Sequence, residues 1–185
     1  RELAGDREGD VRDEDVKSAA AASYAEDGPD MRACRAVGDK FLKLAAEQNK
    51  HIVVLAGRPY HIDPEINHGI GKLLTSLGVA VLSEDSVFQK GKQVRVNVLN
   101  QWTYHARLYR AAEYVSEHAD MDLVQLVSFG CGIDAITTDE VRAILESRGK
   151  LYTQIKIDEI NNLGVVKIRL RSMLAAVEEQ KRRAQ

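Results

Sequence analysis

Short apolar runs alternate with helix-period segments along this chain. The strand-like runs are residues 51–56, 79–82, 123–129 and 151–157. Helical spacing of apolar residues follows each of them, over about 64–77, 94–118, 137–148 and from 163 into the basic end. Strands that alternate with helices form a parallel sheet covered on both faces, because each right-handed connection packs a helix back onto the sheet. The sequence therefore predicts the α/β class, with about four strands in three layers and the strand order 2-1-3-4.

That strand order places two loops together. Ligands bind outside the carboxyl ends of the strands, where the chain connections diverge. With the order 2-1-3-4 this position lies between the first and third strands, after which come Arg58 and Cys131. The glycines on either side of Cys131 keep it accessible.

The first part of the chain differs in composition from the rest. Residues 1–28 are acidic, rich in alanine and poor in large apolar side chains, so we expect a poorly ordered arm or a marginal helix. Residues 29–185 are long enough for a single α/β domain. They begin with a predicted helix to Gln48, whose apolar stripe we expect to face the core: Cys34, Val37, Phe41 and Leu44. Because residue 1 is Arg, we expect a piece excised from a longer protein.

Charge and cysteine content exclude several classes of protein. The formal net charge is -2 with dispersed Lys and Arg, so there is no basic stripe for nucleic acid. No apolar run approaches the ~20 residues that cross a bilayer, and we expect no leader of the charged-then-apolar kind. We expect a cytoplasmic setting, where two cysteines are free thiols or ligands and do not form a disulfide framework.

Common nucleotide and redox motifs are absent. Gly91-Lys92 is followed by Gln93, so it does not end a phosphate loop, and Gly69-Ile70-Gly71 lacks the third glycine of a dinucleotide fingerprint. There is no Cys-x-x-Cys pair.

The two cysteines have different expected roles. Cys131 could be core packing, since free cysteine is often buried, or it could be a thiolate whose pKa is lowered by the helix start below it. Cys34, on an apolar helical stripe, is interpreted as structural.

The other candidate residues also have two interpretations each. Arg58, Tyr60 and His61 either contact a ligand or only shape a turn. Asp63 and Pro64 are expected to start a helix, and His68 lies one turn into that helix. Glu159, after the fourth strand, reaches a metal or belongs to the cap of the next helix. A further set is interpreted as one helix face and its solvated rim: Tyr104, His105, Arg107 and Tyr109.

Five segments carry a resemblance to a known family. They are GRPYHIDPEINHGI within residues 53–70, LSEDS at 82–86, QWTYHARLYR at 101–110, SFGCGIDA at 128–135 and IKIDE at 155–159. These segments resemble bacterial proteins called acyl-CoA dehydratase activase-related, or 2-hydroxyglutaryl-CoA dehydratase activator homologues. The resemblance covers roughly residues 50–178 and lies in the portion similar to the dehydratase subunits, which are flavodoxin-like. Nothing in the chain resembles the ATPase portion of that family.

The resemblance implies a function for the parent protein. It would be a radical 2-hydroxyacyl-CoA dehydratase (a lyase) or its activator, with a 4Fe-4S cluster that receives one electron. Cys131 would be one metal ligand, and the substrate-binding candidates would be Arg58, Tyr60, His61, His68 and Glu159. A cluster with four sulfur positions needs more than Cys131, so no cofactor is expected in this fragment, which should be inactive alone.

Two alternatives remain open from the residues themselves. The chain could be a module that binds acyl-CoA or another small anion through the Arg58 loop. It could also be a non-catalytic domain that docks other domains of the parent chain.

Overall fold

The fold is built on a four-stranded parallel sheet in the order β2-β1-β3-β4. In the computed structural model, which describes residues 12–158, 160 and 162–184, the strands are β1 (Ile52–Ala56), β2 (Ala80–Ser83), β3 (Met121–Val127) and β4 (Thr153–Lys156). Ile52 pairs with Ala80 on one side and Met121 on the other, and Val124 pairs with Thr153. The α/β class and the strand order predicted from the sequence are confirmed.

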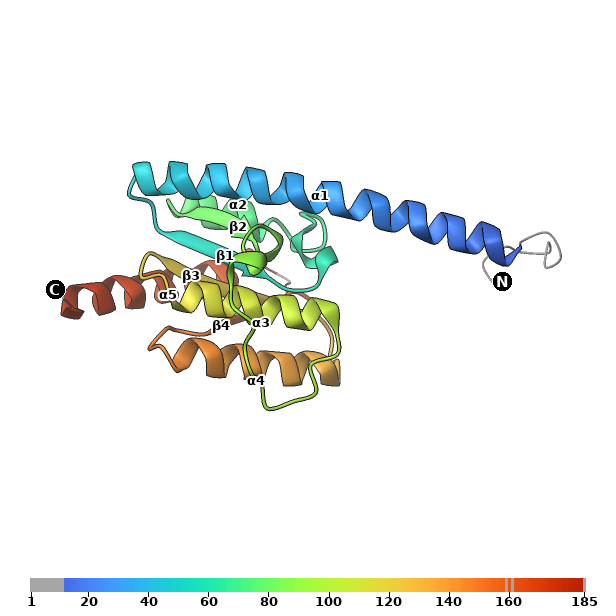
Figure 1. Cartoon of the computed structure of the whole chain (residues 1–185). Helices are drawn as coiled ribbons and strands as arrows, with labels where there is room; N and C mark the ends of the chain where they lie inside the picture. Colours follow the sequence, from blue (N-terminus) through green and yellow to red (C-terminus); the bar gives the residue numbers. More distant parts are fainter. Residues whose placement is uncertain (1–11, 159, 161, 185) are drawn as a thin grey trace.

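Helices cover both faces of the sheet (Figure 1). Alternate residues of β1 point to opposite faces, so Ile52 and Val54 join one core cluster and Val53 and Leu55 the other. The first cluster packs against α1 (Asp13–Glu47), α3 (Thr103–Ser116) and α4 (Gly132–Glu146). The second packs against α2 (Ile70–Ser76) and α5 (Leu163–Ala184). Short 3-10 turns complete the connections: Pro59–Ile62, Glu84–Ser86 and Phe88–Lys90.

The predicted helix from Pro64 starts later than expected. Asp63 Oδ1 does accept hydrogen bonds from the N–H groups of Glu65 and Ile66, at 2.8 and 3.3 Å. His68 and Gly69 then adopt left-handed backbone angles, with φ of 54° and 76°, which interrupt the helix. Asn67 Oδ1 accepts from the N–H of Ile70 at 3.2 Å, and α2 begins there.

Two further helix starts were predicted at the wrong residues. α3 begins at Thr103, not near Val94, because Val94 and Val96 pack on the core from a segment that is not helical. Their alternate spacing is the period of extended chain, not of a helix. α4 begins at Gly132 with Cys131 as its N-cap residue, five residues before the expected start at Thr137.

α1 is one continuous helix that passes through the predicted boundary at residue 28, with Pro29 inside it. Its N-terminal half extends beyond the sheet (Figure 1). The division into an arm and a domain stays a prediction, and residues 1–11 of the arm lie outside the described residues.

The predicted core face of α1 was wrong. Val37, Phe41 and Leu44 are 51%, 52% and 45% exposed, whereas Gly38 and Ala45 are buried. The helix lies so close to the 3-10 turn at Ser86 that a Cβ on Gly38 would fall 2.7 Å from the Ser86 Cβ. Small side chains therefore face the sheet, and the large ones on the neighbouring stripe face solvent. Cys34 is half-buried beside Ser86.

Among the described residues, no helix combines the length and the apolar character needed to cross a bilayer.

The packing assignment predicts unequal effects of two truncations. Leu170 in α5 is fully buried, so Leu170→Ala should lower the free energy of unfolding by about 2–5 kcal/mol. Val37→Ala on the exposed stripe should change it by less than about 0.5 kcal/mol. Urea unfolding followed by circular dichroism measures both. An equal loss from Val37→Ala would mean that this stripe packs on the core.

Candidate functional site

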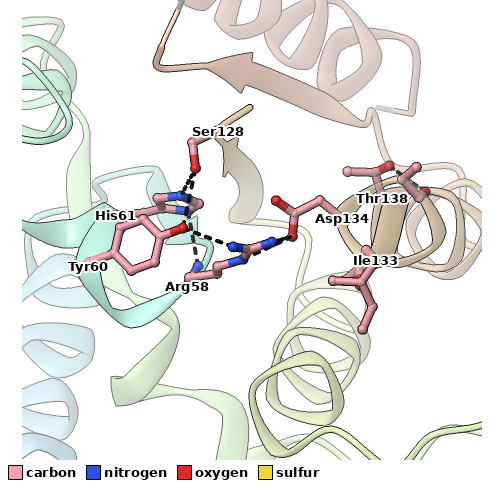
Figure 2. Close-up of polar contacts among 9 residues, drawn as sticks. Arg58, Tyr60, His61, Ser128, Ile133, Asp134 and Thr138 are labelled. Carbon is pink, nitrogen blue, oxygen red and sulfur yellow. Dashed lines mark hydrogen bonds and ion pairs between the residues drawn. The ribbon is translucent and has the colours of Figure 1, made fainter. Parts of the chain in front are cut away.

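The carboxyl ends of β1 and β3 meet at the centre of the sheet, and their loops carry most of the candidate residues. β2 lies beside β1 on one side of this position, and β4 lies beside β3 on the other. The chain connections that follow β1 and β3 therefore leave in opposite directions here. Figure 2 shows that Arg58, after β1, points toward Asp134 in the first turn of α4. This is the position at which the sequence places a site.

Arg58 is held by partners from both loops. Its Nη2 and Nε lie 2.9 and 3.2 Å from Asp134 Oδ1, and its Nη1 donates to the Tyr60 hydroxyl at 3.0 Å (Figure 2). The guanidinium also lies 5.2 Å from the centre of the Phe129 ring. Burial alone would lower the pKa of Arg58, but hydrogen bonds to Cys131 and Asp134 raise it. Arg58 is therefore a permanent and fixed positive charge.

His61 anchors the turn that carries Arg58. Its ring is buried, and Nδ1 accepts the backbone N–H of Arg58 at 3.0 Å. In the neutral ring the proton must then be on Nε2, which donates to Ser128 Oγ at 3.1 Å (Figure 2). Burial lowers the pKa of His61 and so favours this neutral form. A Cβ on Gly57 would fall 2.5 Å from Nδ1, which explains the glycine before this turn.

Ser128 connects the turn to the end of β3. Its hydroxyl lies 3.3 Å from the hydroxyl of Tyr60, which also accepts from Arg58. A closed ring of hydrogen bonds therefore joins Arg58, Tyr60, Ser128 and His61. This ring fixes the first loop against the second before any ligand is present.

Cys131 is the N-cap residue of α4 and is half-buried. The nearby backbone N–H of Ile133, the Arg58 side chain and the backbone N–H of Asp134 lower the pKa of Cys131, although its thiol makes no side-chain capping hydrogen bond. The positive end of the helix dipole acts in the same direction. The arrangement stabilises a thiolate, which is the form that binds metals and attacks electrophiles.

A cavity of about 270 Å³ lies beside the thiol. It is lined by the loop from Phe129 to Gly132, by α4, by the end of β4 at Lys156 and by Asp158 after that strand. Asp134 also lines it, and Asp134 Oδ2 is buried without a hydrogen-bond partner among the described residues. This oxygen is covered by the surrounding protein and is not exposed to the cavity.

The structure brings four of the six sequence candidates together. Arg58, Tyr60 and His61 share one hydrogen-bond network, and Arg58 lowers the pKa of the Cys131 thiol. His68 lies in the exposed turn before α2, and no polar contact found among the described residues joins it to this network. Glu159 lies outside the described residues. The ligand roles of these residues stay predictions.

Two residues that complete the network had no assigned role in the sequence. Asp134 follows Cys131 by three positions, which is the usual place for an acid in the first turn of a helix capped by residue 131. That signal was available, but the helix was expected to begin six residues later than Cys131. Ser128 offered no such signal, because only the alignment of the two loops gives it partners.

A second buried cluster was also missed. Arg107, interpreted as part of a helix face with a solvated rim, is mostly buried and forms ion pairs with Asp85 and Glu84, the latter at 3.0 Å. It also stacks on Phe88, with 4.5 Å from the guanidinium carbon to the ring centre. Burial raises the pKa of Glu84 to about 7, although Arg107 opposes this shift.

The donor set does not suffice for a complete metal centre. In residues 12–158, 160 and 162–184, no group of three or more His, Cys, Asp and Glu side chains is placed to hold a metal ion. Cys131 fits the role of one thiolate ligand. Any cluster here would need its other ligands from outside the described part of the chain.

Comparison with known proteins gives a partial match. Residues 2–87 match the family model described as CoA enzyme activase uncharacterised domain (DUF2229). The match supports an acyl-CoA activase-related family, which is the broader part of the resemblance in the sequence. It ends before β3, so it does not include Cys131. No curated protein and no solved structure matches the chain.

The contacts of Cys131 predict how its reactivity depends on Arg58. Arg58→Gln removes a positive hydrogen-bond donor, so the pKa of Cys131 should rise and its alkylation by iodoacetamide near pH 7 should become several-fold slower. Mass spectrometry of the alkylated peptides over a range of pH measures this. Cys34 in the same chain is the control and should keep its profile. An unchanged Cys131 profile would contradict the assigned contact.

Glu84 predicts a pH effect on stability. Between its ordinary pKa of 4.5 and about 7, the unfolded chain loses a proton that the folded chain keeps. Glu84 therefore destabilises the fold increasingly as the pH rises through this interval. We expect the free energy of unfolding of wild type minus that of Glu84→Gln, measured with urea, to be lower at pH 8 than at pH 5. Glu26→Gln on the exposed part of α1 is the control, and the same trend in that variant would refute the assignment to Glu84.

Proposed function

We propose that this chain supplies one thiolate ligand, Cys131, and one wall of an iron-sulfur site in a CoA activase-related protein. The site would serve electron transfer in a CoA-linked dehydration system. The family match to residues 2–87 supports the CoA activase relationship, and the environment of Cys131 supports the ligand role.

The observation that carries the proposal is the stabilised thiolate. Cys131 is the N-cap residue of α4, and the backbone N–H of Ile133 and the Arg58 side chain lower the pKa of its thiol, which favours the negative charge. Soft thiolate sulfur binds iron strongly, and hydrogen bonds to the sulfur tune the potential of a bound cluster. A 4Fe-4S cluster, when bound, would supply one-electron transfer. The part of this chain is to hold the sulfur, orient it and keep a positive charge beside it.

The remaining ligands would come from other domains of the parent protein or from a partner. This follows from the donor set, since the described residues place only one thiol at the site. A reducing cytoplasmic setting is part of the proposal, because the thiol must stay free to bind metal.

The geometry favours this role over capture of an anionic ligand by Arg58. The guanidinium is already paired with Asp134 and hydrogen-bonded to Tyr60, so fewer of its donors are available to an added anion. The backbone N–H groups of Ile133 and Asp134 at the α4 N-terminus likewise lower the pKa of Cys131. The anion that these groups stabilise is the thiolate itself.

The test is reconstitution of the parent protein that contains this chain. Under anaerobic conditions with ferrous iron and sulfide, wild type should gain the broad visible absorbance of an iron-sulfur cluster. Cys131→Ala should lose most of it, because one of the sulfur ligands is gone. Cys34→Ala is the matched control and should bind the cluster normally. A colourless wild type, or a Cys131→Ala variant with a full cluster, would refute the proposal.

A further inference from the structure

The sheet ends at β4, and among the described residues no strand lies on the outer side of β4. The N–H of Ile157 donates to the carbonyl of Val127 at 2.9 Å, so the alternate residue Ile155 also directs its backbone groups toward β3. The N–H and C=O of Gln154, between them, therefore point outward. Neither has a hydrogen-bond partner among the described residues. Such an edge can pair with another extended chain.

A cavity of about 530 Å³ adjoins this edge, between β4 and the first turns of α5. The lining residues that matter here are Gln154, Ile155, Lys156, Ile160, Val165 and Arg169. α5 packs on the sheet through Val166, whereas Val165, which faces the cavity, is 73% exposed. An apolar wall thus stands beside backbone groups that have no partner. A strand added to β4 would cover both, because its backbone pairs with Gln154 and its side chains reach α5.

The charges at the cavity select the kind of strand. Lys156 and Arg169 both line it, and no Asp or Glu does so among the described residues. A second copy of β4 would bring another Lys156 and another Arg169 to the same edge, where like charges repel each other. An extended segment with acidic side chains has the opposite charge and is favoured by the same residues.

We propose that the outer edge of β4 binds an acidic segment of a partner protein as an added strand. Gln154 donates one backbone hydrogen bond to this segment and accepts one from it. Apolar side chains of the segment pack on Ile160 and Val165, and its carboxylates lie beside Lys156 and Arg169. In this mode the main-chain hydrogen bonds supply affinity and the alternate side chains supply specificity. The interaction does not use the thiol of Cys131, so it stands independently of the iron-sulfur role.

The probe is a short fluorescein-labelled peptide of alternating valine and glutamate, whose binding to the chain is followed by fluorescence anisotropy. A peptide with lysine in place of each glutamate tests the charge. Two further versions of the acidic peptide carry N-methyl groups on alternate backbone nitrogens, one version on the odd and the other on the even positions. Each version loses the N–H groups along one edge of the peptide strand, so the two together test pairing with β4.

Wild type should bind the acidic peptide saturably and the lysine peptide about tenfold more weakly. One N-methylated version should also bind about tenfold more weakly and the other should bind almost normally, because only one edge of the peptide faces β4. Arg169→Glu should weaken binding of the acidic peptide by about tenfold. Arg171→Glu, the same change on α5 outside the cavity lining, is the matched control and should bind like wild type.

Gln154→Pro removes the outward N–H without removing a hydrogen bond to β3, so this edge position tolerates proline. The variant should bind the acidic peptide about tenfold more weakly, whereas Gln154→Ala, which keeps the N–H, should bind like wild type. Circular dichroism checks that both variants fold. If Gln154→Pro does not fold, the two N-methylated peptides test the same hydrogen bonds on the unmodified chain.

Lack of saturable binding, equal affinity for the acidic and lysine peptides, or equal affinity for the two N-methylated versions would overturn the proposal. Analytical ultracentrifugation tests the other occupant of the edge. Dimerisation of wild type that Gln154→Pro abolishes would assign the edge to a second copy and would equally overturn the proposal. Cys131→Ser should retain peptide binding, so failure of the iron-sulfur role and failure of this surface are distinguishable.

Discussion

The ion pair between Arg58 and Asp134 is the contact on which the arrangement at the sheet edge depends. It joins a loop after β1 to the first turn of α4, 76 residues later in the chain. His61 and Ser128 set the turn that carries the arginine, and Asp134 receives the guanidinium on one oxygen. With this pair in place, Arg58 also reaches the thiol of Cys131 and favours its ionised form. Two loops that meet only in the folded protein thus both act on the pKa of the sulfur.

The boundary of the family match does not coincide with a unit of the fold. Residues 2–87 include β1 and β2 but not β3 and β4. Both core clusters contain residues from each side of that boundary, such as Val54 with Leu123 and Leu55 with Val124. β1 pairs with a strand from each part. The matched segment therefore completes its core only together with the residues that follow it.

The strands and their order could be predicted from the sequence, because buried parallel strands leave continuous apolar runs and short right-handed connections restrict their order. Helix starts were less predictable. Left-handed backbone angles at His68 and Gly69 move the start of α2 to a later residue. The N-cap residue of α4 is a cysteine, which lacks the side-chain oxygen by which a helix start is usually recognised in a sequence. The exposed stripe of α1 could not be predicted from periodicity, since the close approach at Gly38 decides which face packs. At the site, Arg58 and Cys131 were placed by the strand order, whereas the partners Ser128 and Asp134 depend on side-chain geometry that a linear pattern does not contain.

The first turns of α4 form a wall shared by two cavities. Asp134 and Ala135 face the one beside the thiol, and Ile133 and Ile136 face a second one beside His105. Because close-packed side chains shift together, any change in the position of these turns would alter a wall of both cavities.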